Sequence, residues 1–78
     1  MQTIQLKLIT GKVFKLTLDP ATTLDELRDI LTEREGYDFS RARFVYQTRP
    51  LMDGNRSIEE YNVWEEYVLY VVFTLRGG

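Results

Sequence analysis

The chain has 78 residues and a nearly balanced charge, with ten lysines plus arginines against twelve aspartates plus glutamates. It contains no cysteine and no histidine, which excludes disulfides, thiolate metal sites and the usual general base near neutral pH. No basic stripe favours nucleic acid, and no apolar run approaches the roughly 20 residues of a membrane span. We therefore expect one soluble intracellular domain with no metal and no membrane segment.

The first predicted element is a hairpin over residues 3–18. Apolar side chains alternate with mostly polar ones on both arms, which is the period of half-buried strands. The alternating apolar residues are Ile4, Leu6 and Leu8 before the turn and Phe14, Leu16 and Leu18 after it. Gly11, within Thr10-Gly11-Lys12, supplies the permissive backbone of a tight turn. One apolar face of this hairpin needs a cover.

The predicted cover is a helix within residues 19–36. Thr23 and Glu26 form a capping box, in which each side chain bonds the other residue's backbone N–H. Gly36 is suited to end the helix in the left-handed conformation. The apolar stripe of this helix consists of Leu24, Leu27 and Leu31, with Ile30 at its edge.

The second half of the chain is predicted to complete a sheet. Residues 42–52 read as a strand, a turn near residues 47–50 and a short extension, and Asp53 to Asn55 is a turn signal. A single turn of helix is predicted within 57–63, and the last strand within 67–75, because branched and aromatic side chains favour an extended chain. This order of elements predicts an α+β domain, in which one helix covers a mostly antiparallel sheet.

Several short motifs follow one another in the order in which ubiquitin has them. They are Thr-Gly-Lys at 10–12, Arg-Glu-Gly at 34–36, Asp-Gly at 53–54, Tyr-Asn-Val at 61–63 and Leu-Arg-Gly-Gly at 75–78. With this joint spacing the sequence resembles the ubiquitin family over its full length, as a divergent member. The resemblance implies the ubiquitin-like β-grasp fold, a mixed sheet packed on one helix, with residues 1–78 as a single domain and 74–78 as a flexible tail. The family's core positions hold Ile4, Leu6, Phe14, Leu16, Leu18, Leu24, Leu27, Leu31, Phe44, Leu51, Ile58, Tyr61, Val63, Leu69 and Val71.

The resemblance also implies a protein modifier with Gly78 as the acyl donor. In this family an activating enzyme adenylates the terminal glycine, and the acyl group passes through enzyme thiols to an amine. The expected partners are therefore activating, conjugating and ligase enzymes, deconjugating proteases and target proteins, and the chain itself is not an enzyme and needs no cofactor. Those partners are expected to recognise the tail residues Thr74, Leu75, Arg76 and Gly77. We expect a monomer in the cytoplasm and also the nucleus.

One tail position departs from ubiquitin. Thr74 stands where ubiquitin has an arginine that helps activating enzymes tell one modifier from another. A hydroxyl cannot replace the fork of donors of a guanidinium. A dedicated or altered activating enzyme is therefore expected.

Two apolar surface patches are implied for ubiquitin-binding-type domains. The first patch consists of Ile9, Val45, Tyr70 and Val72, and the second of Tyr37, Phe73 and Leu75. The alternative for the first patch is that these side chains only pack at a sheet edge or a loop. Trp64 replaces a polar residue of ubiquitin, and it is expected either to extend an interface or to cap the core.

The lysines indicate how the protein would form polymers. Lys7 and Lys12 match ubiquitin lysines, whereas the positions of the two dominant ubiquitin linkages hold Arg49 and Glu65. Arginine stays protonated and cannot accept an acyl group. We expect mostly a single tag, with any polymer built through Lys12 or Lys7, while Lys15 matches no ubiquitin lysine.

Three other functions remain open from sequence alone. A β-grasp sulfur carrier shares the fold and the Gly-Gly end, and would carry a thiocarboxylate. A ubiquitin-like interaction domain within a larger protein would not be conjugated at all. An enzyme is the weakest alternative, because carboxylates such as Asp53 and Glu59 form no pair that suggests acid–base work.

Overall fold

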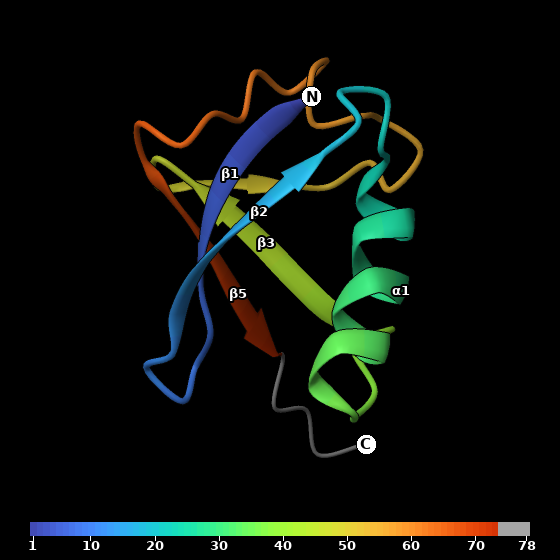
Figure 1. Cartoon of the computed structure of the whole chain (residues 1–78), viewed down its shortest axis with the longest axis vertical. Helices are drawn as coiled ribbons and strands as arrows, with labels where there is room; N and C mark the ends of the chain where they lie inside the picture. The colour runs from blue at the N-terminus through green and yellow to red at the C-terminus, as the bar shows by residue number, and fades with distance from the viewer. Residues whose placement is uncertain (74–78) are drawn as a thin grey trace.

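The computed structural model describes residues 1–73; the tail predicted at 74–78 lies outside the described residues. The chain forms a mixed sheet that packs against one helix, as predicted (Figure 1). Its elements are β1 (Gln2–Lys7), β2 (Val13–Leu18), α1 (Leu24–Glu35), β3 (Ala42–Tyr46), β4 (Arg49–Leu51) and β5 (Val68–Phe73).

The first and last strands of this sheet lie side by side at its centre. The sheet has five strands in the order β2-β1-β5-β3-β4. β1 and β5 pair in parallel, with Gln5 opposite Val68 and Lys7 opposite Tyr70, whereas the other neighbouring strands are antiparallel. A parallel pair needs a long crossover connection. The connection here includes α1, which lies across one face of the sheet (Figure 1).

The first hairpin confirms the predicted turn. Across it, the Leu8 N–H donates to the Lys12 carbonyl at 2.9 Å, and the Gly11 N–H donates to the Leu8 carbonyl at 2.9 Å. Gly11 has a φ of +93°, a conformation that glycine adopts without steric cost. The turn thus ends β1 and reverses the chain into β2 in the expected place.

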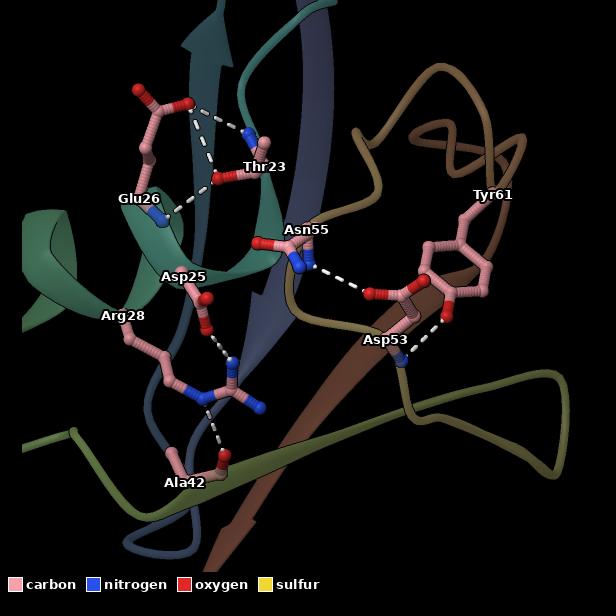
Figure 2. Close-up of polar contacts among 8 residues, drawn as sticks. All are labelled: Thr23, Asp25, Glu26, Arg28, Ala42, Asp53, Asn55 and Tyr61. Carbon is pink, nitrogen blue, oxygen red and sulfur yellow. Dashed lines mark hydrogen bonds and ion pairs between the residues drawn. The ribbon is translucent and has the colours of Figure 1, made fainter.

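The helix is held at both ends by the predicted caps. The Thr23 Oγ1 accepts from the Glu26 N–H at 3.1 Å, and the Glu26 Oε1 accepts from the Thr23 N–H at 2.9 Å (Figure 2). At the other end, Gly36 has a φ of 82° and its N–H donates to the Thr32 carbonyl. These side-chain and backbone partners satisfy groups that a helix end otherwise leaves unpaired.

Arg28 ties the helix to β3. Its Nε donates to the Ala42 carbonyl at 2.8 Å and its Nη1 contacts the Asp25 Oδ1 at 2.8 Å (Figure 2). The guanidinium also lies 5.1 Å from the centroid of the Phe44 ring, within the range of a cation–π contact. Arg28 is therefore a structural residue. The resemblance to ubiquitin aligns Arg28, and also Arg34, with lysines of ubiquitin.

The core confirms most of the predicted positions and adds others. The fully or nearly fully buried apolar residues are Ile4, Leu6, Leu8, Leu24, Leu27, Leu31, Phe39, Ala42, Phe44, Tyr46, Leu51, Ile58, Val63, Leu69 and Val71. Four predicted core residues, Phe14, Leu16, Leu18 and Tyr61, are only partly buried and pack against this cluster. Three of these belong to β2, an edge strand with a neighbour on one side only. Phe39 is the largest fully buried side chain that the family's core positions do not include.

The segment 57–63 forms a hydrogen-bonded turn and not a helix. The Tyr61 N–H donates to the Ser57 carbonyl at 3.0 Å, as one helical turn would. Ser57 and Glu60 bond each other reciprocally, with distances of 3.0 Å and 2.9 Å. At its end the Tyr61 hydroxyl accepts from the Asp53 N–H at 2.8 Å, which anchors the preceding loop (Figure 2).

The second hairpin is tighter than predicted. The expected turn spans 47–50, but Arg49 and Pro50 already belong to β4, and only Gln47 and Thr48 connect the strands. Both connecting residues have positive φ, 51° and 65°. Two-residue hairpin loops favour such angles because their twist matches that of the strands, and asparagine and glycine usually supply them. The sequence gives no signal for a two-residue loop here, because Gln47 and Thr48 are neither asparagine nor glycine.

We expect Thr48→Gly to stabilise the protein by about 0.5–1 kcal/mol. A left-handed backbone costs an ordinary residue roughly 1–2 kcal/mol, and the extra entropy of glycine in the unfolded chain offsets part of the gain. Urea unfolding measures the difference. The matched control is Thr17→Gly in β2, where the same change should destabilise the protein. If both variants lost the same free energy of unfolding, the left-handed backbone of Thr48 would not be a source of strain.

Candidate functional site

The first predicted patch lies on the face of the sheet opposite the core. Val45 on β3 is directly opposite Tyr70 on β5, and Val72 follows on the same strand. Ile9 lies just beyond the end of β1. Ile9 is 62% exposed and Tyr70 46% exposed, whereas Val45 and Val72 are half-buried. The structure therefore brings the four residues to one side of three neighbouring strands.

Strand alternation explains why the side chains on β5 face outward. Val71 is buried in the core, so its neighbours Tyr70 and Val72 point to the other face. Ile9 lies in the turn after β1 and is exposed there. Between the hairpin turn and β5 lies an open hollow of about 380 Å³, lined by residues 7–11 and 70–72. An apolar side chain of a partner could enter this hollow, although its use as a binding site stays a prediction.

The second predicted patch is built on an aromatic cluster that includes Phe39. The Phe39 ring centroid lies 4.7 Å from that of Tyr37 and 5.3 Å from that of Phe73, and Tyr37 and Phe73 are 6.4 Å apart. Tyr37 is 43% exposed, Phe73 is half-buried and Phe39 is inaccessible. Leu75, the third predicted member, lies outside the described residues. Sequence analysis missed Phe39, the side chain on which the other two rest.

A polar turn inserts Phe39 into the core. The Asp38 carboxylate accepts from the Ser40 backbone N–H at 2.8 Å and from its hydroxyl at 3.1 Å. These two bonds, with a smaller contribution from Arg41, lower the pKa of Asp38 below its ordinary value. The Phe39 N–H donates to the Thr32 Oγ1 at 2.9 Å. An apolar residue between two turn-forming polar residues was the available signal for this insertion.

The three lysines differ in their surroundings. The Lys12 Nζ lies 3.1 Å from both Glu35 carboxylate oxygens, and the Lys15 Nζ lies 3.1 Å from Glu65. Lys7 is exposed and makes no ion pair among residues 1–73. An acyl acceptor needs a free amine. Lys12 must therefore break its ion pair with Glu35 before it can react, whereas Lys7 has no ion pair to break among residues 1–73.

Val45→Ala should weaken the binding of a ubiquitin-binding domain by about fivefold or more while costing the fold only about 1 kcal/mol. The half-buried Val45 contributes to the patch surface more than to the core. Isothermal titration and thermal unfolding of the same variant separate the two effects. Val71→Ala, the same change on the inward face, is the control and should mainly reduce stability. Binding that survives Val45→Ala unchanged would remove Val45 from the interface.

Within residues 1–73, no group of three or more acidic side chains is placed to hold a metal ion. In the same range, no helix is long and apolar enough to cross a membrane.

Comparison with known proteins places the chain in a family. The sequence profile described as the ubiquitin family matches residues 4–76. Ubiquitin-like protein 1 of Schizosaccharomyces pombe is 32% identical over 75 residues, which cover 96% of this chain and 95% of that protein. The ubiquitin-like protein NEDD8 of Dictyostelium discoideum is 29% identical, and the NEDD8-like protein RUB1 of Saccharomyces cerevisiae is 28% identical; each match covers 96% of both chains.

A solved structure supports the same assignment. The solution structure of a computationally designed protein, based on the template of human erythrocytic ubiquitin, superposes with a TM-score of 0.80 at 26% identity, and covers 100% of this chain and 98% of that one. The mixed sheet on one helix is thus the ubiquitin-like β-grasp fold. The chain belongs to the ubiquitin family, as a divergent ubiquitin-like protein.

Proposed function

We propose that this protein is a ubiquitin-like modifier, joined through its Gly78 carboxylate to amines of target proteins. The observation that carries the proposal is the full-length match to relatives named ubiquitin-like protein and NEDD8. The family profile runs through Arg76, and the sequence continues with Gly77 and Gly78. The matches cover 95–96% of the relatives' own length, so these relatives are about as long as this chain.

The chemistry would take place in partner enzymes. The Gly78 carboxylate attacks ATP and forms an acyl-adenylate with release of pyrophosphate. An enzyme thiolate displaces AMP to give a thioester, and a target amine then displaces the thiol to give an amide. Gly77 and Gly78 have no Cβ, so they can pass through a narrow active-site channel. This chain supplies the acyl group and the surfaces that enzymes recognise.

The protein should act mostly as a single tag. Of the arginines at ubiquitin lysine positions, Arg28 holds the helix to β3 through the Ala42 carbonyl, and the Arg34 guanidinium lies 4.5 Å from the Phe14 ring centroid. Glu65 forms an ion pair with Lys15. These side chains have structural contacts of their own and no amine that could accept an acyl group. Lys12 and Lys7 are the lysines that remain at ubiquitin lysine positions, so we expect any polymer to be built through them.

Incubation of the protein with cell extract and ATP tests the proposal. Trypsin cleaves after Arg76, so conjugated targets should carry Gly-Gly remnants on lysines that mass spectrometry can map. Remnants on Lys12 or Lys7 would identify polymer linkages. A thiocarboxylate at Gly78 would instead indicate a sulfur carrier. The absence of both a thioester and any adduct would indicate an interaction domain that is not conjugated.

Thr74→Arg should raise the rate of thioester formation with the ubiquitin-activating enzyme by about tenfold or more, since a charge-assisted hydrogen bond contributes about 1.5–3 kcal/mol. The reason is that only arginine offers a fork of donors at this position. Single-turnover thioester assays on gels measure the rate. Thr74→Lys is the matched control, because it restores the charge without the planar fork. A wild-type protein that charges as fast as ubiquitin would show that Thr74 does not select the enzyme.

A further inference from the structure

Two exposed aromatic side chains precede β5. Trp64 is 46% exposed and Tyr67 is 48% exposed. In Figure 1 this orange segment lies at the top of the molecule, whereas β5 runs from there towards the bottom. Residues 64–67 therefore form a surface at the opposite end from Phe73, and we call it the Trp64–Tyr67 surface.

Trp64 is fixed in orientation although it is exposed. The Tyr46 hydroxyl accepts from the Trp64 N–H at 3.1 Å and donates to the Trp64 carbonyl at 3.0 Å. The indole Nε1 donates to the Asn62 Oδ1 at 2.9 Å, and Asn62 has a φ of 60°. The indole thus has its polar atom satisfied within the protein, and its exposed part is an apolar ring. Because the side chain is already held in place, a partner would lose little side-chain entropy by contacting it.

The same buried tyrosine supports the second exposed ring. The Tyr46 and Tyr67 rings meet edge to face, at 6.2 Å between centroids and an interplanar angle of 82°. This is a favourable aromatic geometry. Tyr46 is 6% exposed, so one buried side chain both bonds the Trp64 backbone and contacts the Tyr67 ring.

Two glutamates stand between Trp64 and Tyr67 in the sequence. Glu65 and Glu66 are both exposed, and Glu65 pairs with Lys15 at 3.1 Å. Glu66 makes no ion pair within the described part of the chain. Aromatic ring faces attract cations, and carboxylates bind guanidinium groups through two parallel hydrogen bonds. Anionic ligands such as nucleic acid or acidic lipid are disfavoured by the same charges.

We propose that the Trp64–Tyr67 surface binds an arginine-containing basic segment of a partner protein. An arginine side chain satisfies both features at once, because its planar guanidinium stacks on the indole and its donors reach Glu66. The surface does not involve the C-terminal residues, so this binding is independent of conjugation. A partner held there also leaves the Phe73 end of the protein clear.

The chain offers a direct probe, because Trp64 is its only tryptophan. A synthetic peptide of alternating arginine and glycine should change the Trp64 fluorescence in a saturable way. In nuclear magnetic resonance spectra, the shifted amides should cluster at residues 62–68. The peptide should bind more weakly as salt is added, since part of the attraction is electrostatic. No saturable binding, or shifts centred on Ile9 and Tyr70, would overturn the proposal.

Two variants separate this site from general attraction to an acidic protein. Glu66→Lys should lower the affinity for the peptide at least about threefold. Its control is Glu33→Lys, an identical charge change at an exposed position of α1, which should have little effect.

Trp64→Leu should lower the affinity for the peptide about two- to fivefold, the amount expected of an exposed cation–π contact. Resonance shifts measure this affinity, because the variant has lost the fluorophore. Equal losses in the two glutamate variants, or full affinity in Trp64→Leu, would overturn the proposal.

Discussion

Removal of Gly77 and Gly78 is expected to abolish ATP-dependent adducts and to leave the unfolding temperature unchanged. The loss should be complete because the carboxylate that is activated would then belong to Arg76, whose bulky side chain does not fit a channel built for glycine. The fold should not change, because the core lies entirely within residues 4–71. Gel shifts in extract with ATP, beside a thermal melt, measure both quantities.

The truncated protein also provides its own control. It keeps Ile9, Val45, Tyr70 and Val72, so it should bind a ubiquitin-binding domain with the affinity of the full chain. Lost adducts together with intact binding would separate the two properties of the protein. Adducts that persist after truncation would rule out Gly78 as the acyl donor.

Phe39→Ala should lower the free energy of unfolding by about 3–5 kcal/mol. Phe39 is fully buried and packs against both Tyr37 and Phe73, so truncation leaves a cavity beneath the second patch. Small domains are stable by only about 5–15 kcal/mol in total, so part of the variant population should be unfolded at room temperature. Urea unfolding followed by circular dichroism measures the loss.

Two companion variants define the cause of that loss. Tyr37→Ala removes the neighbouring aromatic ring, but that ring is 43% exposed, so the loss should be less than half as large. Phe39→Leu keeps most of the buried volume and should fold fully. If Tyr37→Ala and Phe39→Ala cost the same, the cluster is not organised around Phe39.

Local signals predicted the elements that depend on neighbouring residues in sequence. The Thr23 and Glu26 box, the Gly36 cap and the Gly11 turn act within a few residues, and all were found where the sequence placed them. Strand alternation likewise predicted that Ile4 and Leu6 face the core, because the period of two needs no knowledge of the partner strand.

The missed features depend on contacts between distant residues. Tyr46 is buried because Trp64 and Tyr67, from another part of the chain, contact it. The residues Gln47 and Thr48 adopt positive φ because the two strands that they join require a tight loop. The core position of Phe39 depends on Phe73, at the end of the last strand. Propensity and periodicity can indicate that such a residue is buried, but they do not identify its distant partners.

The central pairing of β1 with β5 has a consequence for synthesis on the ribosome. β1 leaves the exit tunnel well before its parallel neighbour, β5, which is made only after residue 67. Until then the β1–β2 hairpin and the β3–β4 hairpin have no strand between them, and the apolar face of β1 has only α1 as a cover. Chains dominated by contacts between distant residues fold slowly, and exposed apolar surface invites aggregation in the meantime. The sheet can therefore be completed only after β5 has been made, because β5 joins the two hairpins.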